Sequence, residues 1–468
     1  METQTNNKFS NWIKNSITAR MLMVGFLILI LLIPLSSIET LIRERSSRKY
    51  DVINEINEKW GNEVVLSGPV LKIPYKTYTE TVKIDQATGQ SIKEQVTHIN
   101  NAYFFPNNLT ISADVNAENK NRSIYTTTVF TSNMKCNGNF EKPDFASQDI
   151  KDEDIIWEKA TIIIETSNLK GIRNEVAINF NGAKYPFIPK YKALNNTHNV
   201  YNDYTDSYSM PIQMQQLESG FINPELIPKE SSVNFDFDFN VNGSGQLSFV
   251  PIGKETKIKM ESNWASPSFY GNFLPLNNDD DKVNKDGFNA NWEVLQINRQ
   301  FEQQFFGSLP NLSEFAFGVK LITPVDEYQK SERTAKYGFM VIALTFLIFF
   351  LIQTLSKIRI HPFQYLMIGI ALIMFYTLLI SITEHSSYFT AYIIAGSAVI
   401  ILISIYSKSI LKNIKFPIFI AASLTALYTF IFVIIQLENY ALLVGSIGLF
   451  IILAAVMFFS KKIDWNNS

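Results

Sequence analysis

Histidine and serine residues are the first places to look for catalytic chemistry in this chain of 468 residues. A zinc-dependent protease helix needs two histidines four positions apart, so that both imidazoles face one metal ion. The four histidines, at positions 98, 198, 361 and 385, never have that spacing. A G-x-S-x-G nucleophile turn is also missing from the sequence, and Gly243-Ser244-Gly245 reads better as a hairpin turn. We therefore predict no catalytic residue.

Two partial matches to ligand-binding loops have the wrong residue at a decisive place. Gly253-Lys254 resembles the end of a phosphate-binding loop, but Ser248 stands where the first glycine should be. Five residues of a second stretch fall at the key places of a calcium-binding loop; four of them fit, but the first is a lysine where an acidic ligand is expected. The residues of that stretch are Lys282, Asn284, Asp286, Gly287 and Glu293. We predict a solvated acidic loop there, and no metal or cofactor.

Long apolar runs dominate the C-terminal part of the chain, residues 337–460. Five stretches of 20 to 22 residues contain no Asp, Glu, Lys or Arg. About 20 apolar residues are needed for a helix to cross a bilayer core of about 30 Å. The five runs lie between Lys336 and Lys357, His361 and Glu384, His385 and Lys408, Lys415 and Glu438, and Glu438 and Lys461. We predict a bundle of five transmembrane helices.

Residues 21–38 form a sixth uncharged run of 18 residues, preceded by a polar segment with three basic residues. This pattern fits either a retained anchor or a cleaved signal peptide. The length and the lack of an A-x-A-like cleavage site favour an anchor, with residues 1–20 in the cytoplasm. Residues 39–62 then have apolar residues at roughly helical spacing, which predicts that the helix continues as an amphipathic stalk ending near Gly61.

Short loops between the runs alternate in charge. Basic residues follow the first, third and fifth C-terminal runs, and the other two loops carry acidic residues and a histidine. Lys and Arg accumulate in cytoplasmic loops of membrane proteins. The sequence therefore predicts six crossings of a membrane, both termini in the cytoplasm, residues 461–468 as a cytoplasmic tail, and residues 39–336 outside.

The region from 63 to about 323 has the composition of a mainly β domain. Its best strand signal is Phe235, Phe237 and Phe239 alternating with aspartates, followed by the turn sequence 242–245, which predicts a hairpin with residues 246–251. Residues 63–75 read as two short strands around Gly68-Pro69. One large β unit and two smaller ones both remain compatible with the pattern. Residues 39–336 contain 31 Lys and Arg against 39 Asp and Glu, a net charge of −8 that argues against nucleic acid as a partner.

Several collinear segments together resemble the CreD-like family of bacterial inner-membrane proteins, which is associated with cell-envelope integrity. The segments are Trp60-Gly61 with Gly68-Pro69 and Pro74-Tyr75, Trp264 to Pro275, Gly287 to Trp292, Phe317 to Tyr337, His361 to Tyr365, Thr383 to His385 with Tyr392, Gln436 to Ser446, and Asp464-Trp465. The resemblance implies an N-terminal anchor, a large extracytoplasmic domain and a C-terminal helical bundle. It supplies no reaction and no catalytic residues. Gln353 and Asn439 depart from the acidic residues that the family favours at those places.

Three functions follow as hypotheses. The first is a non-enzymatic inner-membrane protein whose extracytoplasmic β domain supports envelope integrity, with the lipid bilayer and another envelope protein or polymer as partners. The alternative is a transporter or channel for an apolar or lipid-like substrate; the lack of Asp, Glu, Lys and Arg away from the ends of the membrane runs argues against ion-coupled transport. The third is a membrane-bound hydrolase.

Charged residues at the outer ends of the runs form a candidate junction between the β domain and the membrane face. Basic residues before the second crossing and acidic residues in the two other short external loops have opposite signs, so a compact bundle would bring them together. The candidate residues are Arg333, Lys336, Glu384, His385, Glu438 and Asn439. Exposed ion pairs of this kind contribute about 0–1 kcal/mol, and solvated side chains are an equally good explanation.

Overall fold

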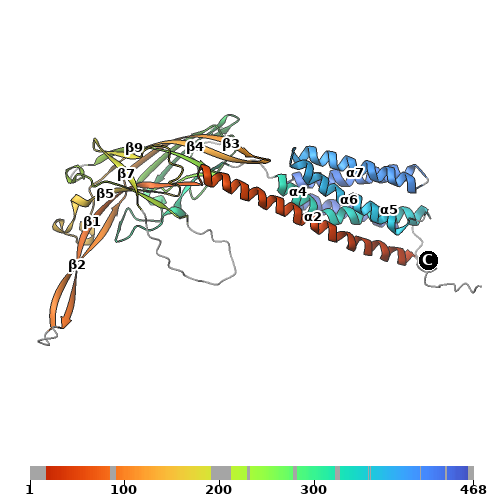
Figure 1. Ribbon diagram of the computed structural model, residues 1–468, viewed down its shortest axis with the longest axis horizontal. Helices are drawn as coiled ribbons and strands as arrows, with labels where there is room; N and C mark the ends of the chain where they lie inside the picture. Colours follow the sequence, from red (N-terminus) through yellow and green to blue (C-terminus); the bar gives the residue numbers. More distant parts are fainter. Residues whose placement is uncertain are drawn as a thin grey trace, which may run out of the picture. The chain divides into compact units, whose positions relative to one another are not determined.

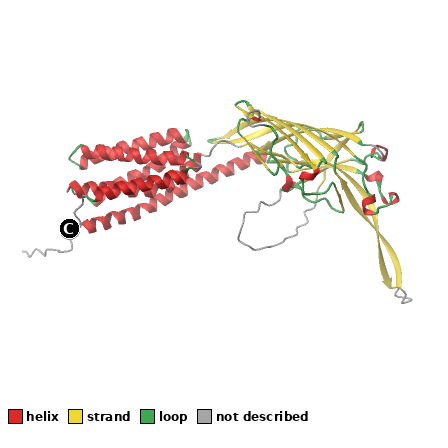
Figure 2. Ribbon diagram, turned by 180° about the vertical axis from the view of Figure 1, so that it is seen from behind, coloured by secondary structure: helices red, strands yellow, loops and turns green. Residues whose placement is uncertain are grey.

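A computed structural model describes residues 17–84, 91–190, 212–228, 232–277, 282–321, 327–356, 358, 360–411, 413–437 and 440–461. The chain divides into two compact units. The helical unit comprises residues up to Asp51 and from Val325 onward, and the β domain comprises Val52–Pro324. Figure 2 shows the long helices and the strands segregated in this way. An N-terminal apolar helix, a mainly β domain and five C-terminal apolar helices confirm the predicted fold class.

The helical unit contains six helices long and apolar enough to cross a membrane among the described residues. The first, α2, is one helix of 44 residues that includes both the predicted anchor and the predicted stalk, and its last residues belong to the β domain. Figure 1 shows the others lying side by side in a bundle. Their bounds are α2 Ile17–Trp60, α5 Gly338–Ser356, α6 Pro362–Thr383, α7 Tyr388–Ile410, α8 Lys415–Gln436 and α9 Ala441–Ser460, and the short helix α4 spans Glu327–Lys336.

Helix α2 packs against the bundle through one stripe of its surface. Its buried residues in the membrane segment are Val24, Leu27, Leu31 and Leu35, spaced three or four apart on one face. Leu31 fills the space beside Gly369 of α6, where an added Cβ would lie 2.2 Å from its Cδ1 atom. Small residues at helix contacts let the backbones approach closely in membranes. The apolar stripe and the glycine therefore fix how α2 lies on α6.

The β domain is built from sixteen strands of described residues in one connected, barrel-like sheet. The strand order is β12-β16-β10-β1-β5-β8-β7-β6-β9-β4-β3-β11-β14-β13, with β2 on β1 and β15 on β2. The bounds are β1 Val64–Ile84, β2 Ser91–Phe104, β3 Asn108–Arg122, β4 Tyr125–Phe140, β5 Thr161–Thr166, β6 Ala177–Phe180, β7 Ala183–Lys190, β8 Gln215–Ser219, β9 Val233–Ser244, β10 Gln246–Phe249, β11 Glu255–Ser262, β12 Pro267–Tyr270, β13 Val283–Asn284, β14 Gly287–Leu295, β15 Gln304–Phe306 and β16 Phe317–Leu321.

One hydrophobic core runs through the whole β domain, from Val64 of β1 to Leu321 of β16. The alternating phenylalanines of β9 point into it, as the sequence predicts, and Phe239 is fully buried. One β unit, and not two, is thus present.

The predicted hairpin at 242–245 is wrong. Residues 242–244 continue β9 and pair with β4, whereas β10 pairs with β1 and β16. The chain changes direction only at Gly245, with φ +68°. Gly243 is required for close packing, because a Cβ there would lie 2.4 Å from Cζ of Phe130. The predicted pair of short strands at 63–75 is also wrong: residues 64–75 belong to one strand, β1, whose pairing with β5 shifts between Ser67 and Val70.

Aromatic side chains join β12, at one end of the strand path, to β14, the second strand from the other end. Phe269 of β12 contacts Phe288 and Trp292 of β14, with ring centroids 5.8 and 5.9 Å apart. Trp292 also contacts Phe317 of β16 at 5.8 Å, and its Nε1 donates to the carbonyl of Phe273 at 3.2 Å. Two of the segments that carry the family resemblance, 264–275 and 287–292, thus form a seam that closes the barrel-like sheet.

Candidate functional site: the projecting arm and the charged helix ends

Strands β1 and β2 extend beyond the sheet as a two-stranded ribbon, here called the arm, residues 76–84 and 91–99. The two strands pair continuously from Leu71↔Phe104 to Ile84↔Ser91. Strand β5 pairs with β1 only as far as Lys72, and β15 pairs with β2 only at Ala102 to Phe104. Beyond the bridge Tyr75↔Ile155, no other described strand pairs with either side of the arm. Figure 1 shows β1 and β2 leaving the body of the β domain together.

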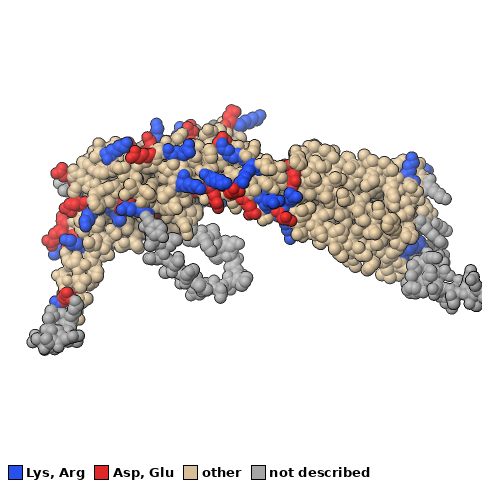
Figure 3. Space-filling view, in the orientation of Figure 1, with Lys and Arg blue, Asp and Glu red and all other residues tan. Residues whose placement is uncertain are grey.

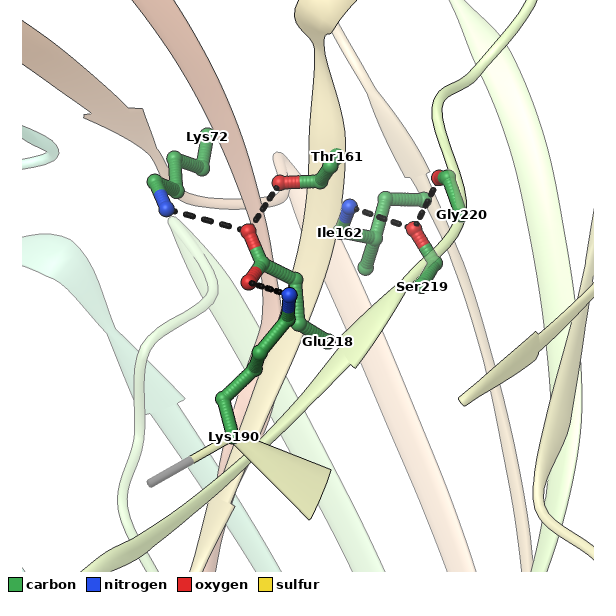
Figure 4. Close-up of polar contacts among 7 residues, drawn as sticks. All are labelled: Lys72, Thr161, Ile162, Lys190, Glu218, Ser219 and Gly220. Carbon is green, nitrogen blue, oxygen red and sulfur yellow. Dashed lines mark hydrogen bonds and ion pairs between the residues drawn. The ribbon is translucent and has the colours of Figure 1, made fainter. Parts of the chain in front are cut away.

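A buried ion pair holds the base of the arm on one face. Glu218 of β8 is buried, and its Oε1 accepts hydrogen bonds from Lys72 Nζ of β1 at 3.0 Å and Thr161 Oγ1 of β5 at 2.8 Å. Its Oε2 lies 3.9 Å from Nζ of Lys190 in β7. Figure 4 shows the carboxylate of Glu218 between these three side chains. Four strands are therefore tied together at the point where β1 begins to leave the sheet.

An aromatic cluster holds the opposite face of the same base. Tyr75 of β1 and Phe104 of β2 point to the side away from Lys72, because neighbouring residues of a strand point to opposite faces. Both rings contact Phe145 and Phe306, with centroids between 5.0 and 6.2 Å apart. Burial raises the pKa of the Tyr75 hydroxyl. The arm thus has a rigid base, with charge on one face and aromatic rings on the other.

The arm itself presents apolar side chains to solvent. Tyr78, Val82 and Ile99 are 47%, 61% and 61% exposed, and strand register places all three on the face that carries Lys72. Tyr78 Oη donates to Asp154 Oδ1 at 2.7 Å, and this carboxylate raises the pKa of the tyrosine. Lys93 Nζ and Glu80 Oε2 join the two strands at 2.9 Å. The arm is therefore a ribbon whose described backbone edges pair with no further strand, and one face combines three exposed apolar side chains with the Glu80–Lys93 ion pair.

A second group of functional candidates lies at one end of the helical unit, where Figure 3 shows charged residues bounding a band free of them. Glu384 follows α6, and its Oε1 lies 3.6 Å from Arg45 Nη1 of α2. Lys336 pairs with Glu332 of its own helix, Nζ to Oε1 at 3.3 Å, and Glu332 also pairs with Arg43. Arg45 and Arg43 were not among the residues predicted from sequence.

The remaining predicted junction residues are placed differently. Arg333 and His385 are exposed, and Glu438 and Asn439 lie outside the described residues. That all six candidate residues lie close together therefore remains a prediction.

Buried polar contacts connect α4 to the start of α7. Tyr388 is buried, its backbone N–H donates to Glu327 Oε2 at 2.8 Å, and its hydroxyl lies 2.6 Å from Thr334 Oγ1. Gln353, one of the departures from the family pattern, is also buried and accepts a hydrogen bond from Tyr365 Oη at 2.8 Å. The neutral amide at 353 is thus satisfied by a neutral donor, as a buried polar group requires.

Replacing Glu384 by Lys tests which cation it pairs with. Glu384→Lys places a lysine beside Arg45, and we expect the thermal unfolding midpoint to fall by about 2–4 °C, as for the loss of about 1 kcal/mol. The double variant Arg45→Glu/Glu384→Lys should recover the midpoint. The matched double variant Lys336→Glu/Glu384→Lys should not, because Lys336 pairs with Glu332. If the double variant with Lys336→Glu recovers the midpoint and the one with Arg45→Glu does not, the pairing of Glu384 with Arg45 is contradicted.

The partial ligand-loop matches have structural explanations. Asn284 Oδ1 accepts from the backbone N–H groups of Asp286 and Gly287 at 2.9 and 3.0 Å, so the calcium-like stretch is the turn between β13 and β14. Lys282 Nζ lies 5.3 Å from the ring centroid of Phe269. Ser248 is buried in β10 and hydrogen-bonds with Tyr270 Oη, and burial raises the pKa of Tyr270 to about 12. These residues therefore stabilise the turn between β13 and β14 and the packing of the sheet.

Comparison with known proteins places the chain among membrane proteins. Residues 16–466 match a family described as "Inner membrane protein CreD". The chain is also 30% identical over 440 residues to the Inner membrane protein CreD of Escherichia coli (strain K12), an alignment that covers 94% of this chain and 91% of that protein. The six apolar helices and the β domain agree with this relationship. The chain therefore belongs to the CreD family of inner membrane proteins.

Proposed function

We propose that the protein contributes to cell-envelope integrity through non-enzymatic binding by its β domain, and that the arm is the binding element. The observation that carries the proposal is a ribbon of two strands whose outer backbone edges pair with no other strand among the described residues. Unpaired strand edges are templates for pairing with another chain, and natural proteins usually cover or charge them. Here the edge is combined with three exposed apolar side chains on one face, Tyr78, Val82 and Ile99, which lie beside the Glu80–Lys93 ion pair.

The partner best suited to this element is an extended segment of another envelope protein. A third strand added to the arm satisfies its free N–H and C=O groups by backbone hydrogen bonds, and alternate side chains give specificity. A two-stranded ribbon alone is marginally stable in water, so a third strand stabilises it. The charged and aromatic contacts at the base keep the arm ordered before the partner binds, which lowers the entropy cost of binding.

The proposal places the β domain outside the cytoplasm and both termini inside it. Its support is the alternation of basic and acidic loops along the sequence, which follows the usual charge bias of membrane proteins. Cysteine labelling in a Cys136→Ala background checks this arrangement. Lys151→Cys, at a position 75% exposed in the β domain, should react with a membrane-impermeant maleimide in spheroplasts. Asn413→Cys, between α7 and α8, should react only after the membrane is opened.

Site-specific photocrosslinking tests the arm directly. A photoreactive amino acid at Val82 or Ile99 in the full-length protein, expressed in its host, should give a discrete crosslinked product that contains a second envelope protein. The same residue at Lys151 is the matched control, since Lys151 is exposed in the β domain but lies outside the arm.

Crosslinks of equal yield from the arm and from Lys151 would contradict the proposed role of the arm. A product that contains envelope polymer and no protein would show that the arm binds a polymer and not a strand of another protein. A shortened arm, with 77–98 replaced by a Gly-containing turn, should lose the product while the β domain keeps its thermal midpoint, because the arm lies outside the shared core.

A further inference from the structure

The helical unit contains a large apolar cavity along three of its helices. Its volume is about 960 Å³, and α5, α8 and α9 line it. Of the 21 residues in its wall, the only polar ones are Ser356, Lys415 and Ser423. Ser356 is the last residue of α5 and Lys415 is the first of α8, so both belong to the same end of the cavity. Among the described residues of its wall, the cavity is therefore apolar along its length, with one cation, Lys415, at one end.

Loose packing of α9 explains why the cavity exists. Helix α9 is apolar on all sides, and none of the residues in its most apolar window is buried. Small residues of α8 and α9, such as Ala426 and Ala455, face the space and leave it wide. Gly448 of α9 lies directly against the ring of Phe430, which holds α9 on α8. Within a bilayer such a space is filled by apolar groups, because it offers water almost no hydrogen-bond partners.

The length of the cavity suits lipid acyl chains. From Lys415 to Phe430, α8 runs along it for about 22 Å at 1.5 Å per residue, which is more than half of a bilayer core of about 30 Å. One leaflet of that core is about 15 Å thick, so the cavity is long enough for the acyl chains of a lipid whose headgroup lies at the Lys415 end.

The charge at the end of the cavity selects the headgroup. Lys415 is exposed, and the described residues include no acidic partner for it. A lysine at the membrane surface attracts anionic headgroups by about 1 kcal/mol, and the first turn of a helix also favours negative charge. We propose that the cavity binds an anionic phospholipid, with acyl chains between α5, α8 and α9 and the phosphate at the Lys415 ammonium group.

Native mass spectrometry of the full-length protein tests this site with two defined lipids of the same acyl chains, phosphatidylglycerol and phosphatidylcholine. The wild-type protein should retain phosphatidylglycerol about fivefold better, which corresponds to about 1 kcal/mol. Lys415→Gln should abolish this preference and leave phosphatidylcholine binding unchanged. Lys461→Gln is the matched control, since Lys461 is an exposed lysine that does not line the cavity.

Substitutions of two neighbouring alanines of α9 distinguish filling of the cavity from general destabilisation of the helical unit. Ala455 lines the cavity, and Ala454 does not. Ala455→Phe should lower the retention of both lipids several-fold, whereas Ala454→Phe should not, with equal thermal midpoints for the two variants. Equal retention of both lipids by the wild type, or equal effects of the two alanine variants, would overturn the proposal. A dimer that Ala455→Phe dissociates, without lipid loss, would assign the cavity to a second copy of the chain.

Discussion

Glu218→Ala should lower the free energy of unfolding of the β domain by about 3–5 kcal/mol, because it removes one partner of a buried ion pair. The side chains of Lys72 and Glu218 are only 22% and 11% exposed, so the ammonium group left behind remains partly desolvated. Thr161 loses its acceptor in the same step. For a domain of this size the loss corresponds to a fall in the thermal midpoint of roughly 10 °C.

The single cysteine of the chain provides the measurement. Cys136 is buried in β4 of the β domain core, and burial raises the pKa of its thiol, so it is unreactive in the folded state. A thiol-reactive dye added to the purified full-length protein during heating therefore reports opening of the β domain alone. The midpoint of labelling should fall for Glu218→Ala and stay nearly constant for Glu80→Ala, whose ion pair with Lys93 is 67% and 72% exposed and contributes about 0–1 kcal/mol.

A compensating pair of substitutions distinguishes charge from packing at Glu218. Apolar residues of similar size often replace a buried ion pair without loss of stability. Lys72→Met/Glu218→Leu should therefore recover most of the midpoint, since Lys190 is 52% exposed and can turn to water. If the double variant is as unstable as Glu218→Ala, the cost lies in packing, and the unpaired lysine is not its cause.

Trp292→Ala should lower the free energy of unfolding of the β domain by about 3–5 kcal/mol, the usual range for a buried tryptophan replaced by alanine. Trp292 is 2% exposed, lies between Phe269 and Phe317, and donates to the carbonyl of Phe273. The substitution leaves a cavity at the seam and an unpaired carbonyl. Dye labelling of Cys136 again supplies the midpoint, with Ile297→Ala, at a position 88% exposed, as the control. Equal midpoints for the two variants would show that the seam does not contribute to closure of the sheet.

The sequence was sufficient to predict the membrane-spanning helices and the mainly β class of the domain between them. Uncharged runs of 20 to 22 residues have few structures open to them other than membrane helices, and Phe235, Phe237 and Phe239 alternate because one face of β9 is packed. The hairpin at 242–245 was predicted wrongly because its local turn signal competes with pairing to β4, more than 100 residues earlier. Such distant pairing leaves no mark in the local pattern.

The functional candidates were harder to predict for two different reasons. Both faces of the arm meet solvent, so β1 lacks alternating apolar and polar residues beyond Tyr75, and neither the arm nor its edges could be recognised. Glu384 was assigned to Arg333 and Lys336, the basic residues before the second crossing, whereas its partner, Arg45, lies on a helix more than 300 residues earlier in the chain. The family resemblance marked Trp292, yet only the structure shows that it closes the sheet.

The position of β1 in the sheet also determines the order in which parts of the β domain can form. Val64 pairs with Leu247, about 180 residues later, and β10 in turn pairs with β16, which ends at Leu321. Contacts over such distances form slowly, because a long loop must close first. The hairpin of β1 and β2 needs only neighbouring residues and can form as soon as both strands are synthesised. During synthesis, the arm is therefore among the first parts of the domain to form, and the barrel-like sheet cannot close until β16, the last strand before the helices of the C-terminal bundle, has been made.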